Sequence, residues 1–234
     1  MDDVPFDAYA EQYDLWFLAN RQVLDSEIRL LAHALGNSMG RCISVGCGTG
    51  LFETALARDF DIHITEGVEP SDGMRAIAEK RGLRVQAASA ETMTLDEAAY
   101  DTIVFNGISS YLPDPAAAFQ KAYQALKPGG RLLVLDVPKE SAYGLLYNFG
   151  SATGSWDHSA FRGVTPANIY PLEFVKAARW STTPDKIAQL EAIGFHSITT
   201  AQTLVRHPAY SNDEVEEPIA GFDRGSYVCV TAIR

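Results

Sequence analysis

The sequence is poor in cysteine and has no long apolar run. Its three cysteines, Cys42, Cys47 and Cys229, have no spacing typical of a metal site and leave an odd thiol in any disulfide scheme. No apolar run approaches the ~20 residues that a helix needs to cross a bilayer, and residues 1–6 lack the basic and apolar regions of a signal peptide. We therefore expect a reduced, cytoplasmic protein with no metal site and no membrane partner.

Positive charge is also scarce. The 234 residues include 19 Lys and Arg against 30 Asp and Glu, which gives a formal net charge of −11. Because nucleic-acid-binding proteins gather Lys and Arg to neutralise phosphates, this balance argues against DNA or RNA as a partner. A chain of this length that is 47% hydrophobic can bury one sizeable core, and we expect a single domain spanning 1–234. Nothing in the composition indicates an oligomeric state.

Glycine is concentrated in one informative run, residues 43–50, with the sequence ISVGCGTG. An apolar strand enters a turn with glycine at alternate positions, Gly46, Gly48 and Gly50, and a helix-like segment follows. Glycine permits positive φ and lets the backbone approach a ligand at a helix N-terminus. The run is not the dinucleotide fingerprint GxGxxG, because Leu51 stands where the last glycine would be needed.

An acidic residue follows at the distance expected for a ribose contact. Glu69 ends the next apolar strand, 21 residues after Gly48 (69 − 48 = 21). A carboxylate in this position can accept hydrogen bonds from ribose hydroxyls. Strand, glycine turn, helix, strand and carboxylate together predict a nucleoside site.

Strand and helix patterns alternate along the chain, which predicts an α/β protein with a parallel sheet covered on both faces. The expected helices run through the stripe Leu24, Ile28, Leu31 and Leu35, from Ser71 to Gly82, through 119–126, and from a Thr183 cap to Gly194. The expected strands lie near 42–46, 64–69, 84–88, 101–106, 131–137, 197–205 and 227–233.

Several segments resemble the motifs of a known family, in order: 6–14, 45–50, 68–74, 88–91, 100–106 and 126–131. They are similar to those of class I S-adenosylmethionine-dependent methyltransferases, in particular the quinone-biosynthesis-type and related small-molecule enzymes. The resemblance implies a Rossmann-like, doubly wound, mostly parallel sheet of seven strands whose last strand is antiparallel. It also implies S-adenosylmethionine as cofactor and S-adenosylhomocysteine as product.

The resemblance further assigns residues around the cofactor. The glycine loop would follow the methionine part, Glu69 would take the ribose hydroxyls, and Met74 would press on the adenine ring. An N-terminal lid and helix, 1–36, would close over the cofactor and be mobile without it. The implied cofactor contacts are Tyr13, Gly46, Cys47, Gly48, Gly50, Glu69, Pro70, Ser71, Met74, Ala90, Glu91, Asn106 and Gly107.

Residues 138–180 break the alternation and are rich in aromatic side chains. Ligands in open α/β sheets bind beyond the carboxyl ends of the strands, where this insertion emerges. We interpret it as a substrate cap, with a small satellite core as the alternative. The expected acceptor is a small, partly apolar molecule methylated on oxygen, nitrogen or carbon, and the expected contacts to it are Tyr111, Tyr147, Trp156 and Tyr170.

The general base for such an acceptor is harder to assign. Ser109-Ser110-Tyr111 replaces the His-His-Leu common after this strand in related enzymes. The candidate catalytic residues are then Asp157, His158 and His207, with solvated loop or turn positions as the alternative interpretation. Residues 106–109 also differ from the Asn/Asp-Pro-Pro-Tyr of enzymes that methylate nucleic-acid bases or glutamine, which disfavours those acceptors.

Two other functions stay open. One is a nicotinamide-dependent oxidoreductase, which the GxGxG spacing disfavours. The other is a protein that binds S-adenosylmethionine without transferring its methyl group, since its cofactor motifs would be the same.

Overall fold

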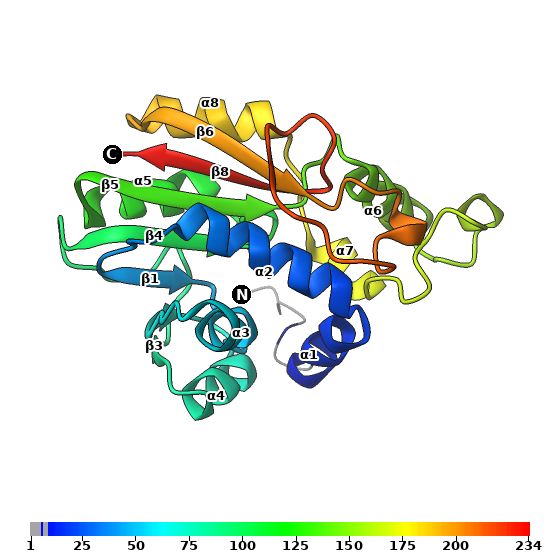
Figure 1. Cartoon of the computed structure of the whole chain (residues 1–234), viewed down its shortest axis with the longest axis horizontal. Coiled ribbons are helices and arrows are strands. Elements are labelled where there is room, and N and C mark those ends of the chain that lie inside the picture. Colours follow the sequence, from blue (N-terminus) through cyan, green and yellow to red (C-terminus); the bar gives the residue numbers. More distant parts are fainter. Residues whose placement is uncertain (1–5, 7–8) are drawn as a thin grey trace.

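A computed structural model describes Phe6 and residues 9–234, which form one sheet with helices on both faces (Figure 1). In this described part the sheet has eight strands, in the order β3-β2-β1-β4-β5-β8-β6-β7. Their bounds are β1 Cys42–Val45, β2 Glu66–Val68, β3 Arg84–Gln86, β4 Tyr100–Asn106, β5 Leu126–Asp136, β6 His196–Thr203, β7 Ile219–Ala220 and β8 Tyr227–Ile233.

The direction of the strands confirms a mostly parallel sheet. β1 to β5 are parallel to one another, whereas β8 runs antiparallel to its neighbours β5 and β6. β7 adds a two-residue antiparallel edge beside β6, so the sheet has one strand more than the seven expected. Two residues are too few to show a periodic pattern, which is why the sequence does not reveal this strand.

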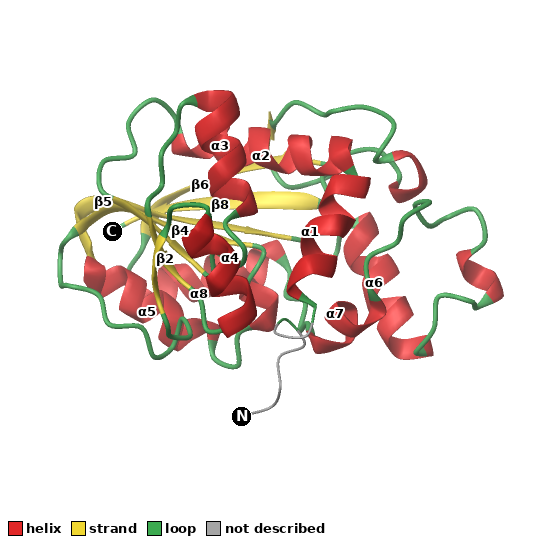
Figure 2. Cartoon of the chain, turned by 90° about the horizontal axis from the view of Figure 1, so that it is seen from below, coloured by secondary structure: helices red, strands yellow, loops and turns green. Residues whose placement is uncertain are grey.

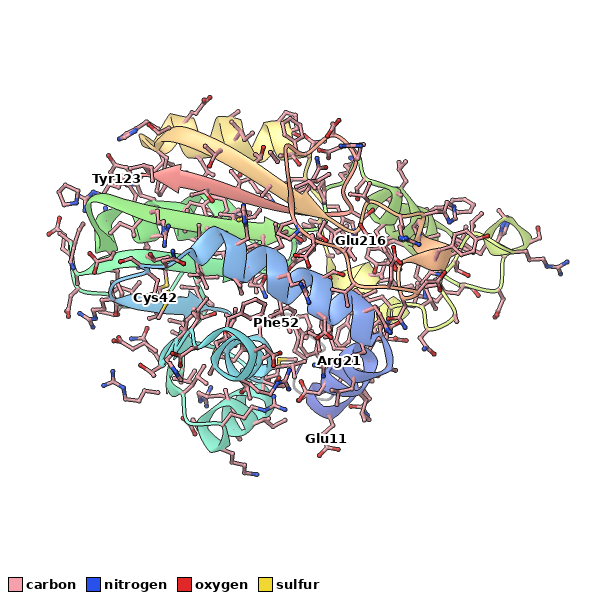
Figure 3. The ribbon with its side chains drawn as sticks, in the orientation of Figure 1. Glu11, Arg21, Cys42, Phe52, Tyr123 and Glu216 are labelled. Carbon is pink, nitrogen blue, oxygen red and sulfur yellow. The ribbon has the colours of Figure 1, made fainter. Side chains whose placement is uncertain are left out.

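Helices cover the two faces of the sheet, with α2 and α3 on one side and α5 and α8 on the other (Figure 2). Side chains of β5 alternate between the two cores: Leu133 and Leu135 pack on the α2 side, and Leu132 and Val134 on the α5 side. Phe52 of α3 lies beneath α2 (Figure 3). The helices are α1 Ala10–Ala19, α2 Arg21–Leu35, α3 Leu51–Phe60, α4 Asp72–Lys80, α5 Pro115–Ala125, α6 Ala142–Thr153, α7 Leu172–Ala177 and α8 Thr183–Ile193, with 3-10 turns η1 Ser109–Tyr111, η2 Ser159–Phe161 and η3 Pro208–Tyr210.

Local capping explains where several helices begin. The Met74 amide donates to the Ser71 hydroxyl (3.1 Å), which starts α4 as the sequence predicts. At α8 the expected cap is one residue too late: the Asp185 amide donates to Thr182 Oγ1 at 3.1 Å, so Thr182 is the cap and Thr183 is already helical. Pro184 then occupies the first turn, where its missing N–H is harmless.

The N-terminal arm and the aromatic insertion both join the main core. The arm forms α1 and buries Asp14 and Phe17, although residues 1–5, 7 and 8 of the expected lid lie outside the described residues. In the insertion, the aromatic rings of α6 and α7 belong to the same buried cluster as the α2 leucines. A separate satellite core is therefore not what these aromatic residues form.

None of the helices among the described residues has the combined length and apolarity of a membrane span. No grouping of His, Cys, Asp and Glu side chains in that part of the chain has the arrangement of a metal site.

Candidate active site

The glycine loop joins β1 to α3 through three residues with positive φ. Gly46, Gly48 and Gly50 have φ of +66°, +54° and +73°. The amides of Gly46 and Cys47 both donate to Val68 O, at 2.7 and 3.1 Å, which holds the loop against the end of β2. A Cβ at Gly46 would lie 2.6 Å from the Ile108 side chain. The loop therefore requires glycine for its backbone and for its close packing.

Glu69 braces this loop. Its buried carboxylate accepts from the Gly48 amide through Oε2 and from the Ser71 amide through Oε1, both at 2.9 Å. The carboxylate thus links the glycine loop to the start of α4, a structural role that sequence reasoning did not identify. A ribose would have to share these oxygens with the two amides, which an anionic carboxylate permits because each oxygen has more than one acceptor site.

Cys47 and Met74 fill space beside the loop. Burial raises the pKa of the Cys47 thiol, which disfavours the reactive thiolate form. The Cys47 sulfur lies 2.7 Å from the position that a Cβ at Gly67 would take, so it fills the space beside that glycine. The Met74 sulfur lies 3.6 Å from the position of a Cβ at Gly48, so its thioether borders the open side of the loop.

The expected adenine edge follows β3. Ala90 is buried, and Glu91 lies in a turn rather than in a helix. Glu91 Oε1 accepts from the Asp114 amide at 3.4 Å, which connects this turn to the start of α5. Pro70 is exposed beside Ser71.

Asn106 and Gly107 end β4 next to a residue that the sequence did not single out. The Tyr227 hydroxyl donates to Asn106 Oδ1 at 3.0 Å, and a Cβ at Gly107 would lie 3.3 Å from that hydroxyl. Burial raises the pKa of Tyr227 well above its usual value. Because Tyr227 begins β8, only the strand order places it beside the end of β4.

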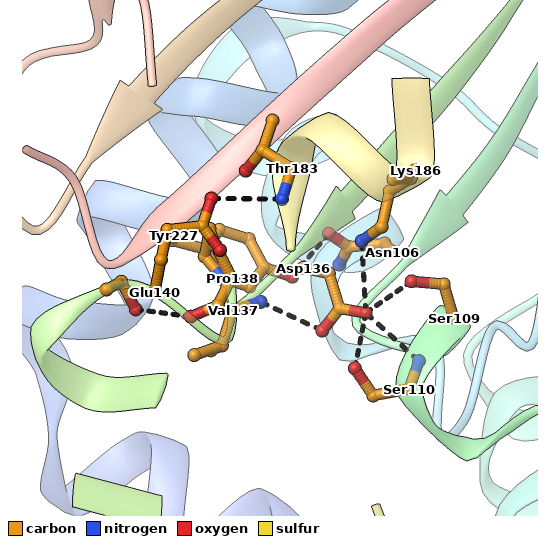
Figure 4. Close-up of polar contacts among 11 residues, drawn as sticks. Asn106, Ser109, Ser110, Asp136, Val137, Pro138, Glu140, Thr183, Lys186 and Tyr227 are labelled. Atoms are coloured by element: carbon orange, nitrogen blue, oxygen red, sulfur yellow. Dashed lines mark hydrogen bonds and ion pairs between the residues drawn. The ribbon is translucent and has the colours of Figure 1, made fainter. Parts of the chain in front are cut away.

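A buried carboxylate organises the segment after β4 (Figure 4). Asp136 is 2% exposed, and its Oδ2 accepts from the Ser110 amide (3.0 Å), the Ser110 hydroxyl (2.7 Å) and the Ser109 hydroxyl. Lys186 Nζ lies 3.4 Å from the same oxygen, and the Val137 amide donates to Oδ1 at 2.8 Å. Ser109 and Ser110, which stand in place of the His-His pair, therefore donate hydrogen bonds to the buried Asp136 carboxylate.

A second polar network ties α1 to the glycine loop. Asp14 accepts from Thr49 Oγ1 through Oδ1 and from Arg81 Nη2 through Oδ2, both at 2.6 Å. Arg81 Nη1 also donates to Thr49 O at 2.9 Å. We call Asp14, Thr49 and Arg81 the α1 latch. Tyr13, the residue before Asp14, has its ring centroid 6.4 Å from that of Phe174 in the aromatic insertion.

The structure brings the four expected substrate contacts into one group. Tyr147 lies with its ring centroid 5.8 Å from Tyr170 and 5.4 Å from Trp180, and Tyr111 is 6.3 Å from Trp180. The Trp156 ring centroid is 6.5 Å from that of Tyr147, and Trp156 Nε1 donates to Tyr170 O at 3.1 Å. The Trp156 ring also fills the space that a Cβ at Gly150 would need.

The candidate bases lie apart from this group. Asp157 and His158 are exposed, in a segment at the far end of the insertion in both Figure 1 and Figure 2. His158 Nδ1 accepts from the Ala160 amide and His207 Nδ1 from the Ala209 amide, both at 3.2 Å. Each exposed histidine thus caps a 3-10 turn, which corresponds to the turn interpretation and gives no geometric support to a catalytic role.

Two open hollows occur at the opposite end of the strands. One is bordered by Glu66 and Arg84, the other by Gly40 and Arg131. Both lie at the amino-terminal ends of the parallel strands, whereas the glycine loop follows the carboxyl end of β1. They are therefore separate from the site built here.

Comparison with known proteins identifies the class. Residues 17–181 match a family model described as a methyltransferase domain, so the chain belongs to that family. A solved structure from Thermotoga maritima, described as a SAM-dependent methyltransferase and possible histamine N-methyltransferase, is 29% identical and superimposes with a TM-score of 0.82 over 97% of each chain. An uncharacterized protein of Methanocaldococcus jannaschii is 29% identical over 228 residues, 97% of each chain.

A third relative bears on the type of enzyme. A ubiquinone biosynthesis O-methyltransferase of Aeromonas salmonicida is 27% identical over 145 residues, which covers 55% of this chain and 58% of that protein. The class I methyltransferase fold and S-adenosylmethionine as cofactor are confirmed, while the quinone-biosynthesis type is supported only loosely.

Proposed function

We propose that this chain transfers the methyl group of S-adenosylmethionine to a small, partly apolar molecule, at an oxygen, nitrogen or carbon atom. The observation that carries this proposal is the position of Tyr13. It adjoins the α1 latch on one side, and its ring lies 6.4 Å from Phe174 of the aromatic insertion on the other. A cofactor at the glycine loop and an acceptor among the aromatic rings would therefore be neighbours.

The residues present fit the cofactor. The glycine loop offers backbone without side chains at the N-terminus of α3, where a Cβ at Gly50 would come within 3.2 Å of Leu83. Glu69 would take the ribose and Met74 the adenine ring. The remaining contacts proposed from the resemblance are Tyr13, Cys47, Pro70, Ser71, Ala90, Glu91, Asn106 and Gly107.

In this reaction the chain itself would position the acceptor and exclude water from the site. The bound cofactor supplies a methyl group on a sulfonium, whose sulfur is a good leaving group. The protein must then hold the acceptor atom in line with that methyl group, in a site closed to solvent. The buried rings of Tyr147, Tyr170 and Phe174 supply such surroundings.

The nature of the acceptor is supported only in outline. The net charge of −11 favours a small molecule over a nucleic acid. Among the relatives, one is described as a possible N-methyltransferase and another as an O-methyltransferase, so they leave the accepting atom open.

Turnover with a panel of small aromatic amines, phenols and carboxylic acids tests the proposal. We expect S-adenosylhomocysteine to accumulate with one or more of them, and S-adenosylmethionine to raise the melting temperature of the free protein. Cofactor binding without turnover on any acceptor would favour a protein that does not transfer the methyl group. A fluorescence titration that shows NADH binding in its place would favour the oxidoreductase.

A further inference from the structure

Glu27 of α2 is a buried carboxylate on a helix face that packs into the aromatic core, because its neighbours Leu24 and Leu31 belong to the same buried cluster as Tyr147 and Tyr170. It is 6% exposed and stands on the apolar face of α2, between Leu24 and Leu31. Burial raises the pKa of five tyrosines that belong to this buried cluster or pack against it, and the charge of Glu27 raises each pKa further: Tyr13, Tyr143, Tyr147, Tyr170 and Tyr227. We call Glu27 and these five residues the Glu27 cluster.

The Glu27 carboxylate has no polar partner in the described part of the chain, where no hydrogen bond and no ion pair reaches it. Buried charges in proteins are otherwise paired, as Asp136 is with Lys186. Trp180 Nε1 is also buried without an acceptor among the described residues, and its ring centroid lies 5.4 Å from that of Tyr147.

No cation of the described residues is paired with Glu27. Burial raises the pKa of Glu27 well above its usual value, and the negative charge of Asp136 raises it further. The groups that face it are the five tyrosines and Asp136, and Lys186 is already bonded to Asp136. A cation beside Glu27 would oppose both causes of the shift.

We propose that the Glu27 cluster binds the ammonium group of a small cationic amine, which is the substrate class of the methyl transfer proposed above. The carboxylate would neutralise the ammonium group, and the tyrosine faces would contact it and the apolar part of the molecule. The ammonium nitrogen is here the recognition group. This inference rests on the proposed function, because it places the amine next to Tyr13 and so beside the cofactor.

Matched pairs of probes separate charge from shape. Phenethylamine, tyramine and tryptamine would each be titrated beside the corresponding alcohol, 2-phenylethanol, tyrosol and tryptophol, with S-adenosylhomocysteine present. We expect each amine to bind about tenfold or more tightly than its alcohol, because only the amine adds a charged hydrogen bond and a cation–π contact.

Two variants assign the preference to Glu27. Glu27→Gln should bring the amine and the alcohol to nearly equal affinity, while its affinity for S-adenosylmethionine stays unchanged. Asp25→Asn is the matched control, since it removes one charge from the same helix at a residue paired with Arg21 and should keep the preference. Should Glu27→Gln fail to fold, Glu27→Asp, which draws the carboxylate back by one methylene, should weaken binding of each amine more than binding of its alcohol.

The outcomes distinguish this proposal from the broader one. Amines that bind no more tightly than their alcohols, or a preference that survives in Glu27→Gln, overturn the amine site. If neutral acceptors are then still methylated, the proposed function stands and only its substrate class is wrong. If no acceptor yields S-adenosylhomocysteine, the proposed function fails by a separate measurement.

Discussion

The glycine loop and the Glu27 cluster are built in opposite ways. Around the glycine loop, the amides of Gly46, Cys47 and Gly48 all donate to Val68 O or to Glu69. In the Glu27 cluster, a carboxylate lies among aromatic rings without a described partner. The first region is complete as folded, whereas the second has an unmet charge that a ligand can satisfy.

This difference separates what the two sites can recognise. A loop whose backbone is fixed by its own hydrogen bonds presents the same surface whatever the acceptor, which suits a cofactor common to a whole family. The Glu27 cluster is made of side chains from several distant segments. A substitution in any of these segments can therefore change what the cluster recognises. If the proposed amine site is right, acceptor choice would belong to α1, α2, the aromatic insertion and β8 together.

The largest expected effect is at Asp136, the anion at the end of β5. Asp136→Ala removes the partner of buried Lys186 and should lower the free energy of unfolding by about 3 to 5 kcal/mol, the range for breaking a buried ion pair. Urea unfolding measures it. The double variant Asp136→Ala, Lys186→Met should recover part of the loss, because no buried charge then lacks a partner. A double variant as unstable as the single one would contradict this account.

The next effect tests whether the glycine loop is fixed by its backbone and its packing. Gly46→Ala would hold an alanine at a strained positive φ and place its Cβ 2.6 Å from the Ile108 side chain. We therefore expect the free energy of unfolding to fall by about 2 to 4 kcal/mol. Gly163→Ala is the control, with φ of +76° and no atom within 4 Å of its Cβ. It should lose only about 1 kcal/mol by unfolding titration. Equal losses would show that the contact with Ile108 contributes nothing.

The sequence predicts the first of these regions well. Apolar runs and glycine turns locate β1, β4 and the loop between β1 and α3 because contiguous residues encode them. The α1 latch was missed because residues 14, 49 and 81 meet only in the fold. Glu27 carried a readable signal: it stands three residues after Leu24 and four before Leu31, inside a stripe that is otherwise apolar.

A moderate effect is expected at the α1 latch. Asp14→Asn keeps the size of the side chain but loses the ion pair with Arg81, which is partly exposed, and should cost about 1 kcal/mol. Hydrogen exchange of α1 should become faster, and S-adenosylmethionine should slow it in the wild-type protein. Glu11→Gln, on the outward side of α1 (Figure 3), should change neither. Unaltered exchange in Asp14→Asn would mean that other contacts hold α1.

The smallest effect concerns the stability of the Glu27 cluster without ligand, because Glu27→Gln preserves the volume of the side chain. Burial raises the pKa of Glu27 in the folded protein above its value in the unfolded chain. The stability contributed by the protonated carboxyl is present below the unfolded pKa and is lost as pH rises through the folded pKa. Glutamine cannot ionise, so relative to the wild-type protein Glu27→Gln should become more stable as pH increases from about 4 to 8.

Urea unfolding of both proteins across this pH range measures the difference. Asp25→Asn, which alters a solvent-accessible carboxylate on the same helix, should show no such gain at high pH. Identical pH profiles for Glu27→Gln and the wild-type protein would mean that the fold tolerates the Glu27 charge without a partner. The cluster would then have no unmet demand for a cation, and the contrast between the two regions would lose its physical basis.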